Sequence, residues 1–532
     1  MKVHTDIRKY PVGIQTFSEI IQEDYVYVDK TESVWQLAHY AKYIFLSRPR
    51  RFGKSLLTTT LASYFRGERE LFEGLKIMDL EQEWQQYPVI HLSLSTAKDL
   101  DSSDALRDRL LLLLKPYKEK YGSDPDEKTP GGVLTGLISR AYKNTGKQVV
   151  VLLDEYDAPL LDMLHENKVL ASMRKVMQEF YQPLKDSEAM IKFCFITGIT
   201  KFSQLSIFST INNLVNVTLD PAFSAICGIT EKELTTTLRP DIERIAEKYT
   251  LSYEDMHEKL KLQYDGYHFT EDSDEIYNPY SLMKAFLQRK VASYWFESGT
   301  PMFLIHQMQH FRTDIMSLDR IEVPSSAFDQ PTENMEDALP LLYQSGYLTI
   351  KDYDPEIEAY TLSIPNQEVR VGYVQGLLPA YIGLKGRDVQ MGFAAKFWLA
   401  LKKSDLDLAM REMQAYLAGI PYVEGFKKKL EEVASAEGFY EYTMYLIFSM
   451  LNVYVRTQVK VAGGRVDMVV WMPDAIYVFE LKVNGTAQEA LQQIDSKSYA
   501  IPYQTDGRQV VKVGVKFDAE KRVPVEWVMC RQ

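Results

Sequence analysis

Apolar and polar residues alternate along the chain in two different ways. Up to about residue 230, short β-branched apolar runs are separated by longer stretches with helical spacing. Strands that are apolar along their whole length and alternate with helices are typical of a parallel sheet covered on both faces. Residues 1–230 are therefore predicted to form one α/β domain. Its strands are expected at 42–47, 88–95, 149–154, 191–198 and 214–220.

The pattern becomes helical after residue 230. Thr230 is followed three residues later by Glu233, which is the spacing of a capping box and predicts a helix start. We assign residues 231–295 to a helical lid region. Around 335–365 a helical pattern runs into two strand patterns, which indicates a winged-helix-like region over 296–384.

The last segment, 385–532, is expected to contain helices up to about residue 455 and then a strand-rich part. Two turn signals, Gly463-Gly464 and Pro473-Asp474, divide "TQVKVAGGRVDMVVWMPDAIYVFELKV" into three strands of a meander. A helix, "AQEALQQIDSKSYAI", and a final strand, "VVKVGVKF", close the segment. A second α/β domain is therefore predicted at this end of the chain.

Composition limits the possible classes of protein. At 532 residues the chain is too long for one hydrophobic core, and with a net charge of −12 any nucleic-acid-binding surface must be a local basic patch. Its three cysteines are too few and too widely spaced for a disulfide framework or a Cys-rich zinc site, which favours a reducing compartment. The start of the chain has no apolar leader pattern, and the apolar run 110–114 is far below the ~20 residues that span a bilayer. We expect a cytoplasmic protein without membrane contact.

The stretch "SRPRRFGKSLL" has the parts of a phosphate-binding loop. An apolar strand pattern precedes it, a helical pattern follows it, and it ends in Gly53-Lys54-Ser55. Backbone N–H groups at such a helix N-terminus face phosphates, while Lys54 would reach the β- and γ-phosphates and Ser55 would hold Mg²⁺. Arg48 stands where the first glycine of the pattern is usual, which favours a loop with extra arginines near the nucleotide.

A second motif, "VVVLLDEYDAPLL", ends a predicted strand in acids. Asp154 lies where a second magnesium-positioning carboxylate belongs, and Glu155 is placed to polarise the attacking water. The next strand ends at Thr197, where a polar residue can sense the γ-phosphate. The alternative is a strand cap and a surface turn, but two motifs in the right order, each at a strand end, argue against it.

These two motifs define a set of nucleotide-binding candidates. One further strand pattern lies between them in the sequence, which is the order in ATPases whose catalytic glutamate follows the second acid. The expected ligand is ATP with Mg²⁺. The candidates are Arg50, Arg51, Phe52, Gly53, Lys54, Ser55, Leu56, Asp154 and Thr197, with Glu155 as the catalytic acid.

The hairpin stretch "GRVDMVVWMPDAIYVFELKV" carries an acid near the far end of each apolar run. If Pro473-Asp474 is the centre of the turn, Asp467 and Glu480 face each other with Cβ atoms about 4.5–5.5 Å apart. Lys482 points to the same face, since it lies two residues beyond Glu480. Opposed like charges destabilise a sheet, and a divalent cation is one natural compensation.

Such a set suits metal-dependent phosphodiester cleavage. Asp467 and Glu480 would hold Mg²⁺ or Mn²⁺, and Lys482 would steady the attacking hydroxide or the developing charge. Arg465 lies opposite Lys482 by the same arithmetic, so a solvated salt-bridge cluster is the alternative. Gln493 on the following helix favours the metal site, because a polar helix residue over the sheet would complete it.

Together these motifs resemble a bacterial and archaeal family that joins an AAA-ATPase-like N-terminal domain to a C-terminal PD-(D/E)XK nuclease-like domain. The resemblance covers nearly the whole chain. It includes "YPVGIQTFSEI", "YVYVDKT", "YIFLSRPRRFGKSLL", "VVVLLDEYDAPL", "FITGITKFS", "YDGYHF", "YNPYSL", "LLYQSGYLTI", "GRVDMVV", "YVFELKV" and "EALQQIDSKSYAIPY".

The resemblance implies a P-loop ATPase core, a helical and winged-helix-like middle, and a restriction-endonuclease-like α/β domain over 385–532. The arginine-rich loop without its first glycine is typical of the family. The "VDKT" motif with Asp29 and Lys30 belongs to it without a role that the residues reveal. By motif, the nuclease signature falls on Asp467, Glu480 and Lys482, the helix after it on Gln493 and Tyr499, and an additional metal ligand on Glu441.

Two classes of function follow from these motifs. The first is an ATPase that governs a metal-dependent nuclease acting on DNA or RNA. The second is an ATP-switched binding or regulatory protein whose nuclease-like domain recognises nucleic acid or a partner without cutting. Analogy with related ATPases suggests a homo-oligomer.

Overall fold

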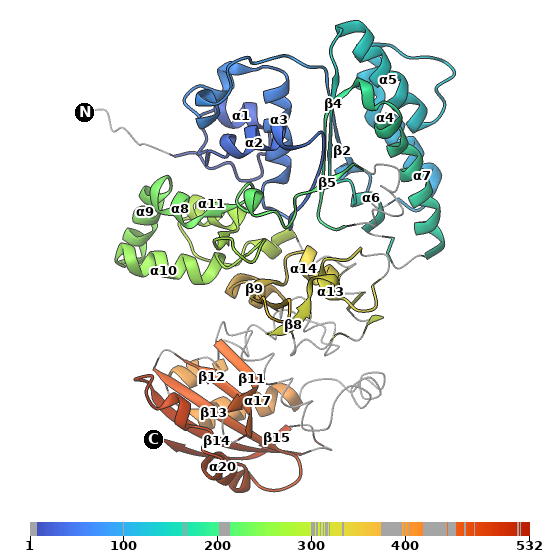
Figure 1. Ribbon diagram of the computed structural model, residues 1–532. Helices are drawn as coiled ribbons and strands as arrows, with labels where there is room; N and C mark the ends of the chain where they lie inside the picture. Colours follow the sequence, from blue (N-terminus) through green and yellow to red (C-terminus); the bar gives the residue numbers. More distant parts are fainter. Residues whose placement is uncertain are drawn as a thin grey trace, which may run out of the picture. The chain divides into compact units, whose positions relative to one another are not determined.

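The chain divides into two compact units, Met1–Thr313 with Arg320–Val369 and Asp314–Asp319 with Arg370–Gln532. The finer boundaries at 230, 295 and 384 stay predictions. The computed structural model (Figure 1) describes residues 8–531 except 99, 162, 165–166, 202–212, 299–303, 305–306, 309, 312, 314–317, 319, 332–334, 374–395, 398, 404, 419–443, 445–453, 462–463, 473, 519–520 and 522.

A parallel five-stranded sheet with the order β2-β3-β4-β1-β5 forms the centre of the first unit. β4 therefore separates β1, which leads into the glycine-lysine loop, from β3, which ends in Asp154. This order confirms the predicted P-loop type of α/β core, and β3 and β4 have the predicted bounds. The strands are β1 (Tyr43–Ser47), β2 (Val89–Ser93), β3 (Val149–Asp154), β4 (Ile191–Gly198) and β5 (Val215–Asn216).

The strand predicted at 214–220 is shorter than expected. Only Val215 and Asn216 pair with β1. The N–H of Val217 still donates to the carbonyl of Phe45 at 2.9 Å, but at Thr218 the side-chain hydroxyl, and not the backbone, accepts from the N–H of Ser47 at 3.1 Å. The side chain of Asn216 accepts a hydrogen bond of 3.0 Å from the N–H of Thr218, so this donor does not extend the ladder. The prediction was therefore wrong about the second half of this strand.

Helices cover both faces of the parallel sheet. α1, α2 and α3 lie on one side, and α4, α5 and α7 lie on the other (Figure 1). Burial on both faces explains why all residues of β1 and β3 are buried. The helices are α1 (Phe17–Gln22), α2 (Thr31–Tyr40), α3 (Lys54–Phe65), α4 (Ser103–Tyr121), α5 (Pro130–Thr145), α6 (Ala158–Leu161) and α7 (Asn167–Asp186).

The lid region begins with the predicted capping box. The hydroxyl of Thr230 accepts from the N–H of Glu233 at 3.2 Å, and the Glu233 carboxylate accepts from the N–H of Thr230 at 2.8 Å. This reciprocal pair satisfies two backbone donors at the start of α8 and confirms the predicted helix start. The region contains α8 (Glu231–Thr236), α9 (Arg239–Tyr249), α10 (Tyr253–Tyr264), α11 (Pro279–Gln288) and a short sheet of β6 (Ile229–Thr230) with β7 (Ile276–Tyr277).

An antiparallel sheet of order β8-β10-β9 follows the lid region. The expected hairpin of residues 335–365 is present, since β9 pairs with β10 and α14 precedes it. A winged-helix identity stays a prediction. We call this part the middle module; it consists of β8 (Ile321–Pro324), α13 (Ser325–Phe328), α14 (Leu339–Gln344), β9 (Thr349–Asp354) and β10 (Ala359–Ser363).

The second unit contains a mixed sheet of order β11-β12-β13-β14-β15, in which only the β13–β14 pair is parallel. Helix α17 packs with the residues on one face of β13, and helix α20 packs with those on the other face. Glu480 shares the α20 face with Ile476 and Val478, because side chains alternate along a strand. The elements are α17 (Leu406–Ala418), β11 (Tyr454–Val461), β12 (Gly464–Trp471), β13 (Ala475–Lys482), α20 (Ala487–Ser496), β14 (Gln509–Asp518) and β15 (Val523–Arg531).

The expectation that "VVKVGVKF" is the final strand was wrong. β15 follows it and pairs antiparallel with β14 at the edge of the sheet. Its sequence hid this, because Pro524 cannot donate to a ladder, and edge positions carry exposed residues instead of an apolar run. The register shift between Lys516 and Phe517 lies opposite this proline.

No helix in the described parts of the chain is both long enough and apolar enough to cross a membrane.

Candidate functional site

The loop between β1 and α3 contains two residues in the left-handed backbone conformation just before the helix. Arg51 has φ of 66° and Gly53 has φ of 93°. Arg51 carries a side chain in this conformation, which is unusual, and Gly53 adopts it without steric cost. A turn of this kind next to a helix N-terminus makes backbone N–H groups converge, and such a concavity binds anions.

Lys54 is held inside this loop. Its ammonium donates to the carbonyl oxygens of Arg48 and Pro49, both at 2.9 Å, and the side chain belongs to a residue only 7% exposed. Burial lowers the pKa of Lys54, and the carboxylates of Asp154, Glu155 and Asp157 oppose this shift. The lysine is therefore a buried cation placed among three acids.

Arg48 stands where a phosphate-binding loop usually has its first glycine, and its side chain points into the protein interior. Its guanidinium donates to the carbonyls of Ser47, Thr218 and Phe223 at 2.9–3.0 Å and lies 4.2 Å from the ring centre of Phe269. Burial lowers its pKa to about 10. Arg48 therefore braces the entry of the loop and is not one of the residues that line the pocket.

A pocket of about 610 Å³ lies over the loop. Besides the loop, its lining includes residues 11–15, 26–28 and 30 from the N-terminal segment, and residues 226–229, 279, 280 and 283. Eight of the ten sequence-predicted nucleotide residues line it: Arg50, Arg51, Phe52, Gly53, Lys54, Ser55, Leu56 and Glu155.

Asp154 and Thr197 lie behind this pocket. Asp154 is 3% exposed and receives hydrogen bonds from Ser55 and from the N–H of Glu155. Its burial raises its pKa. Thr197 is fully buried and donates its hydroxyl to the carbonyl of Leu46 at 2.7 Å. Asp154 therefore acts on the pocket through Ser55, while the hydroxyl of Thr197 is occupied within the sheet.

Glu155 is engaged by a lysine that sequence reasoning missed. The ammonium of Lys98, in the segment after β2, lies 2.8 Å from the Glu155 carboxylate, and both residues line the pocket. Their side chains are 40% and 28% exposed, so solvent weakens the pair. Lys98 has no motif around it, so no sequence signal could have placed it here.

The "VDKT" motif joins the N-terminal segment to the lid region. Asp29 accepts from the N–H and hydroxyl of Thr31 at 2.9 and 2.6 Å and from the N–H of Lys76 at 2.8 Å. Lys30 lines the pocket and donates to the Glu233 carboxylate at 2.7 Å. The motif therefore fixes the start of α2 and ties one pocket wall to α8.

Arg51 connects the loop to the lid region, at α11 and at the last residues of the region. Its guanidinium lies 3.8 Å from the ring centre of Tyr280 and donates to the carbonyl of Tyr294 at 3.1 Å. The carboxylate of Glu368 accepts from the N–H groups of Tyr294 and Trp295 at 2.6 and 3.0 Å. Arg51 and Glu368 therefore hold the same short segment from its two sides.

The raised pKa of Glu368 leads us to predict that the stability of the protein depends on pH. Burial raises its pKa to about 7, and the folded state therefore binds the proton more tightly than the unfolded state does. Its contribution is full below pH ~4.5 and is lost as pH rises through ~7, a change of up to roughly 3 kcal/mol. Glu368→Gln should show a smaller loss of stability between about pH 5 and pH 8, measured by urea denaturation.

Asp265 adds a slope of the same sign, because burial raises its pKa to about 7 as well. The Glu368→Gln variant should therefore keep part of the pH dependence, and a double variant with Asp265→Asn should keep less. An unchanged slope in Glu368→Gln would contradict the assignment.

The hairpin in the second unit has the predicted register. Met468 pairs with Phe479 and Trp471 with Ile476, and the next residues outward along the two strands are Asp467 and Glu480. The Asp467 carboxylate accepts from the N–H of Leu481 at 2.8 Å and raises the pKa of Glu480 by its charge. The two acids are therefore neighbours across the strand pair.

Glu480 is a buried carboxylate. It is 1% exposed, and burial followed by the charge of Asp467 raises its pKa to about 7. Oε1 accepts from the ammonium of Lys482 at 3.2 Å and from the amide of Gln493, whereas Oε2 has no hydrogen-bond partner among the described residues. This burial argues against the alternative of a solvated salt-bridge cluster.

The residues fit a divalent ion of the magnesium type. The described residues contain no group of three or more His, Cys, Asp or Glu side chains that could hold a metal. Mg²⁺, however, is usually held by one or two carboxylates and keeps several waters. Asp467 and the free oxygen of Glu480 supply that donor set. Glu441, the additional candidate, lies outside the described residues.

Helix α20 lies close to the sheet and carries Gln493 over it. This is possible because the residue of β14 beneath the helix is Gly514, which has no side chain. A Cβ at Gly514 would lie 2.1 Å from the carbonyl oxygen of Ala487 and 2.7 Å from the N atom of Leu491. Gly514 pairs with Glu480 in the neighbouring strand. Tyr499 is 3% exposed, and its hydroxyl would lie 3.0 Å from a Cβ at Gly464.

We therefore expect Gly514→Ala to push α20 away from the sheet. The obstructing atoms belong to the helix backbone, so relief requires a shift of the whole element, and overpacking of this kind costs about 1–3 kcal/mol. Urea denaturation should show this loss, and amide exchange in α20 should become faster. Wild-type stability of the variant would show that the helix has room to spare.

Two family profiles match this chain. One, described as a predicted AAA-ATPase, covers residues 11–208, and the other, the PD-(D/E)XK nuclease superfamily, covers residues 435–527. An uncharacterized protein in the vnfD 5' region of Azotobacter chroococcum mcd 1 is 33% identical over 531 residues, which is 98% of this chain and 99% of that protein. The matched segments contain strands β1 to β4 of the P-loop sheet and the Asp467–Glu480 hairpin described above. The chain belongs to the family of proteins that join a predicted AAA-ATPase to a C-terminal PD-(D/E)XK nuclease-superfamily domain.

Proposed function

We propose that the chain binds and slowly hydrolyses ATP in the N-terminal pocket, and that the nucleotide state governs metal-dependent cleavage of nucleic-acid phosphodiester bonds by the C-terminal domain. The observation that carries the cleavage part is the free, buried oxygen of Glu480 beside Asp467 and Lys482. A carboxylate oxygen without a donor is costly inside a protein unless a cation or water completes it.

In the nucleotide site the chain supplies binding and orientation. The N–H groups of the loop and the ammonium of Lys54 would receive the β- and γ-phosphates, and Ser55, backed by Asp154, would hold Mg²⁺. Bound Mg²⁺ neutralises charge on the phosphates. Glu155 orients the attacking water and accepts its proton once its carboxylate is free of Lys98.

In the carboxylate site Asp467 and Glu480 would hold Mg²⁺ or Mn²⁺. When bound, such an ion would supply Lewis-acid chemistry, polarising the scissile phosphate and lowering the pKa of a water. Lys482 places positive charge next to the developing oxyanion, and Gln493 fixes the orientation of the Glu480 carboxylate through its amide. The substrate class is a DNA or RNA strand.

A second candidate function is an ATP-switched protein whose C-terminal domain recognises nucleic acid or a partner without cutting. The net charge of −12 favours recognition of a partner other than nucleic acid, because contact with a polyanion, whether or not it is cut, needs a local basic surface. Both candidates share the nucleotide pocket. They differ only in whether Asp467 and Glu480 hold a metal that cuts.

A cleavage assay on a panel of nucleic acids tests the proposal. Single- and double-stranded DNA and RNA are incubated with the full chain and Mg²⁺ or Mn²⁺, with and without ATP, while ATP turnover is followed in parallel. Metal-dependent cutting supports the first function. ATP turnover without cutting under any condition supports the second, and no ATP binding would overturn both.

A further inference from the structure

Asp157 belongs to the nucleotide pocket but has no role in the mechanism above. It lies three residues after Asp154, directly before α6, is 1% exposed and lines the pocket. Its Oδ2 atom accepts three hydrogen bonds, from the N–H groups of Ile199 and Thr200 at 2.9 and 2.7 Å and from the hydroxyl of Thr200 at 2.8 Å. One oxygen of this carboxylate therefore fixes the chain just beyond the end of β4.

The other oxygen of Asp157 is free. Oδ1 is buried and has no hydrogen-bond partner among the described residues. It occupies the place of a side chain on β4, since a Cβ at Gly198 would lie only 2.4 Å from it. The hydroxyl of Thr197, the preceding residue, is bound to Leu46 inside the sheet. Asp157, which lines the pocket, therefore has a buried oxygen without a partner among the described residues that lies against Gly198 at the end of β4.

We propose that Asp157 is the residue through which the end of β4 responds to the γ-phosphate of bound ATP. A carboxylate and a phosphate oxygen are both acceptors, so they cannot bond directly. The contact is a water molecule beside the γ-phosphate that donates to Oδ1, and Asp157 positions that water and the neighbouring Glu155. This inference rests on the proposed ATPase function.

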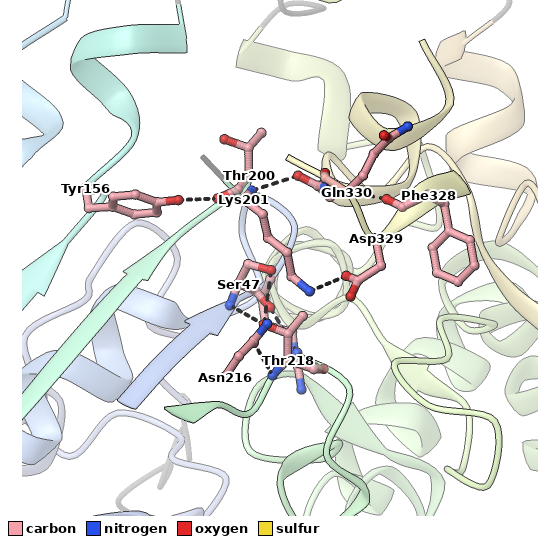
Figure 2. Close-up of polar contacts among 11 residues, drawn as sticks. Ser47, Tyr156, Thr200, Lys201, Asn216, Thr218, Phe328, Asp329 and Gln330 are labelled. Atoms are coloured by element: carbon pink, nitrogen blue, oxygen red, sulfur yellow. Dashed lines mark hydrogen bonds and ion pairs between the residues drawn. The ribbon is translucent and has the colours of Figure 1, made fainter. Parts of the chain in front are cut away.

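The segment fixed by Asp157 is also bound to the middle module (Figure 2). The N–H of Lys201 donates to the side-chain oxygen of Gln344 at 2.7 Å, and its ammonium pairs with Asp329. The hydroxyl of Tyr156 donates to the carbonyl of Thr200 at 2.8 Å. A displacement of residues 199–201 therefore changes the contacts of α13 and α14.

The Asp157→Asn variant distinguishes the roles of the two carboxylate oxygens. The amide oxygen can still accept the three donors at Ile199 and Thr200, while an NH₂ group replaces the free acceptor and the negative charge is lost. We expect ATP turnover to fall about 100-fold, an effect typical of misplacing a reacting group, with ADP affinity changed less than about 3-fold. An equal loss of ATP and ADP binding, or wild-type turnover, would overturn the assignment.

A matched control is Asp265→Asn in the same unit. Asp265 is also buried, 3% exposed, with a free Oδ1 atom among the described residues, but it does not line the pocket. Asp265→Asn should change the stability of the protein, but it should not lower ATP turnover while leaving ADP affinity unchanged, as Asp157→Asn does. If both variants lose turnover alike, Asp157 has only a structural role.

Hydrogen exchange gives a readout that needs binding but no turnover. Peptides containing Thr200 and peptides containing Gln344 are compared with Mg²⁺-ATP and with Mg²⁺-ADP. In the wild type ATP should slow exchange in both regions more than ADP does, and in Asp157→Asn the difference should vanish. A chain that binds ATP, shows this difference and fails to turn ATP over would refute the hydrolysis proposal while supporting the role of Asp157. The same exchange with both nucleotides in the wild type would refute that role.

Discussion

Lys54→Ala is expected to lower ATP turnover by about 10³-fold and to weaken nucleotide binding by about 10–100-fold. The ammonium of Lys54 is the buried cation that lines the pocket, and charge-assisted bonds to phosphate contribute about 1.5–3 kcal/mol. The larger effect on turnover follows because charge moves toward the β–γ bridge as the terminal phosphate leaves, where a positioned donor contributes most. Phosphate release and binding of a fluorescent nucleotide measure the two quantities separately.

The variant needs a check of folding, since Lys54 also bonds two carbonyls of the loop at 2.9 Å. Thermal denaturation with and without nucleotide supplies it: the variant should keep a cooperative transition but gain little from Mg²⁺-ATP. Lys192→Ala, an exposed lysine on β4, is the matched control and should behave as the wild type. A Lys54→Ala protein that hydrolyses ATP normally would show that the pocket is not the site of turnover.

The sequence predicted the parts of both sites that depend on local patterns. β3 is apolar up to Asp154, and β4 is mainly apolar apart from the exposed Lys192 and ends at Gly198, so the bounds of both strands could be predicted to the residue. The hairpin register followed from one turn, because a shift by one residue would move every side chain to the other face. Chain-local chemistry was therefore enough to place Lys54, Glu155, Asp467 and Glu480.

What the sequence could not reveal are contacts between distant segments. The direction of Arg48 depends on the carbonyls of Thr218 and Phe223, about 170 positions later in the chain. Lys98 meets Glu155 only because β2 and β3 are neighbours in the sheet. The absence of a side chain at Gly514 acquires meaning only when α20 lies above it. Such features require the fold before they can be recognised.

Glu480→Gln is expected to abolish metal-dependent cleavage, with a loss of about 10³-fold or more, because the substitution removes one of two carboxylates that hold the ion. The amide has the size of the carboxylate, so a residue 1% exposed keeps its packing. The carboxamide nitrogen, however, is a donor facing the place of a cation. Cleavage of the best substrate from the panel, measured over a range of Mn²⁺ concentrations, separates lost metal binding from lost chemistry.

Asp495→Asn on the same helix as Gln493 is the matched control. Its side chain is 56% exposed and pairs with Lys512 at 2.6 Å, away from the pair of acids. It should cut at the wild-type rate, whereas Glu480→Gln should not cut even at high Mn²⁺. Lys54→Ala completes the comparison, since a change in its cutting would show that nucleotide governs the nuclease. If Glu480→Gln cuts as the wild type does, the activity belongs to a contaminant or to another site, and the binding function without cleavage becomes the better account of this domain.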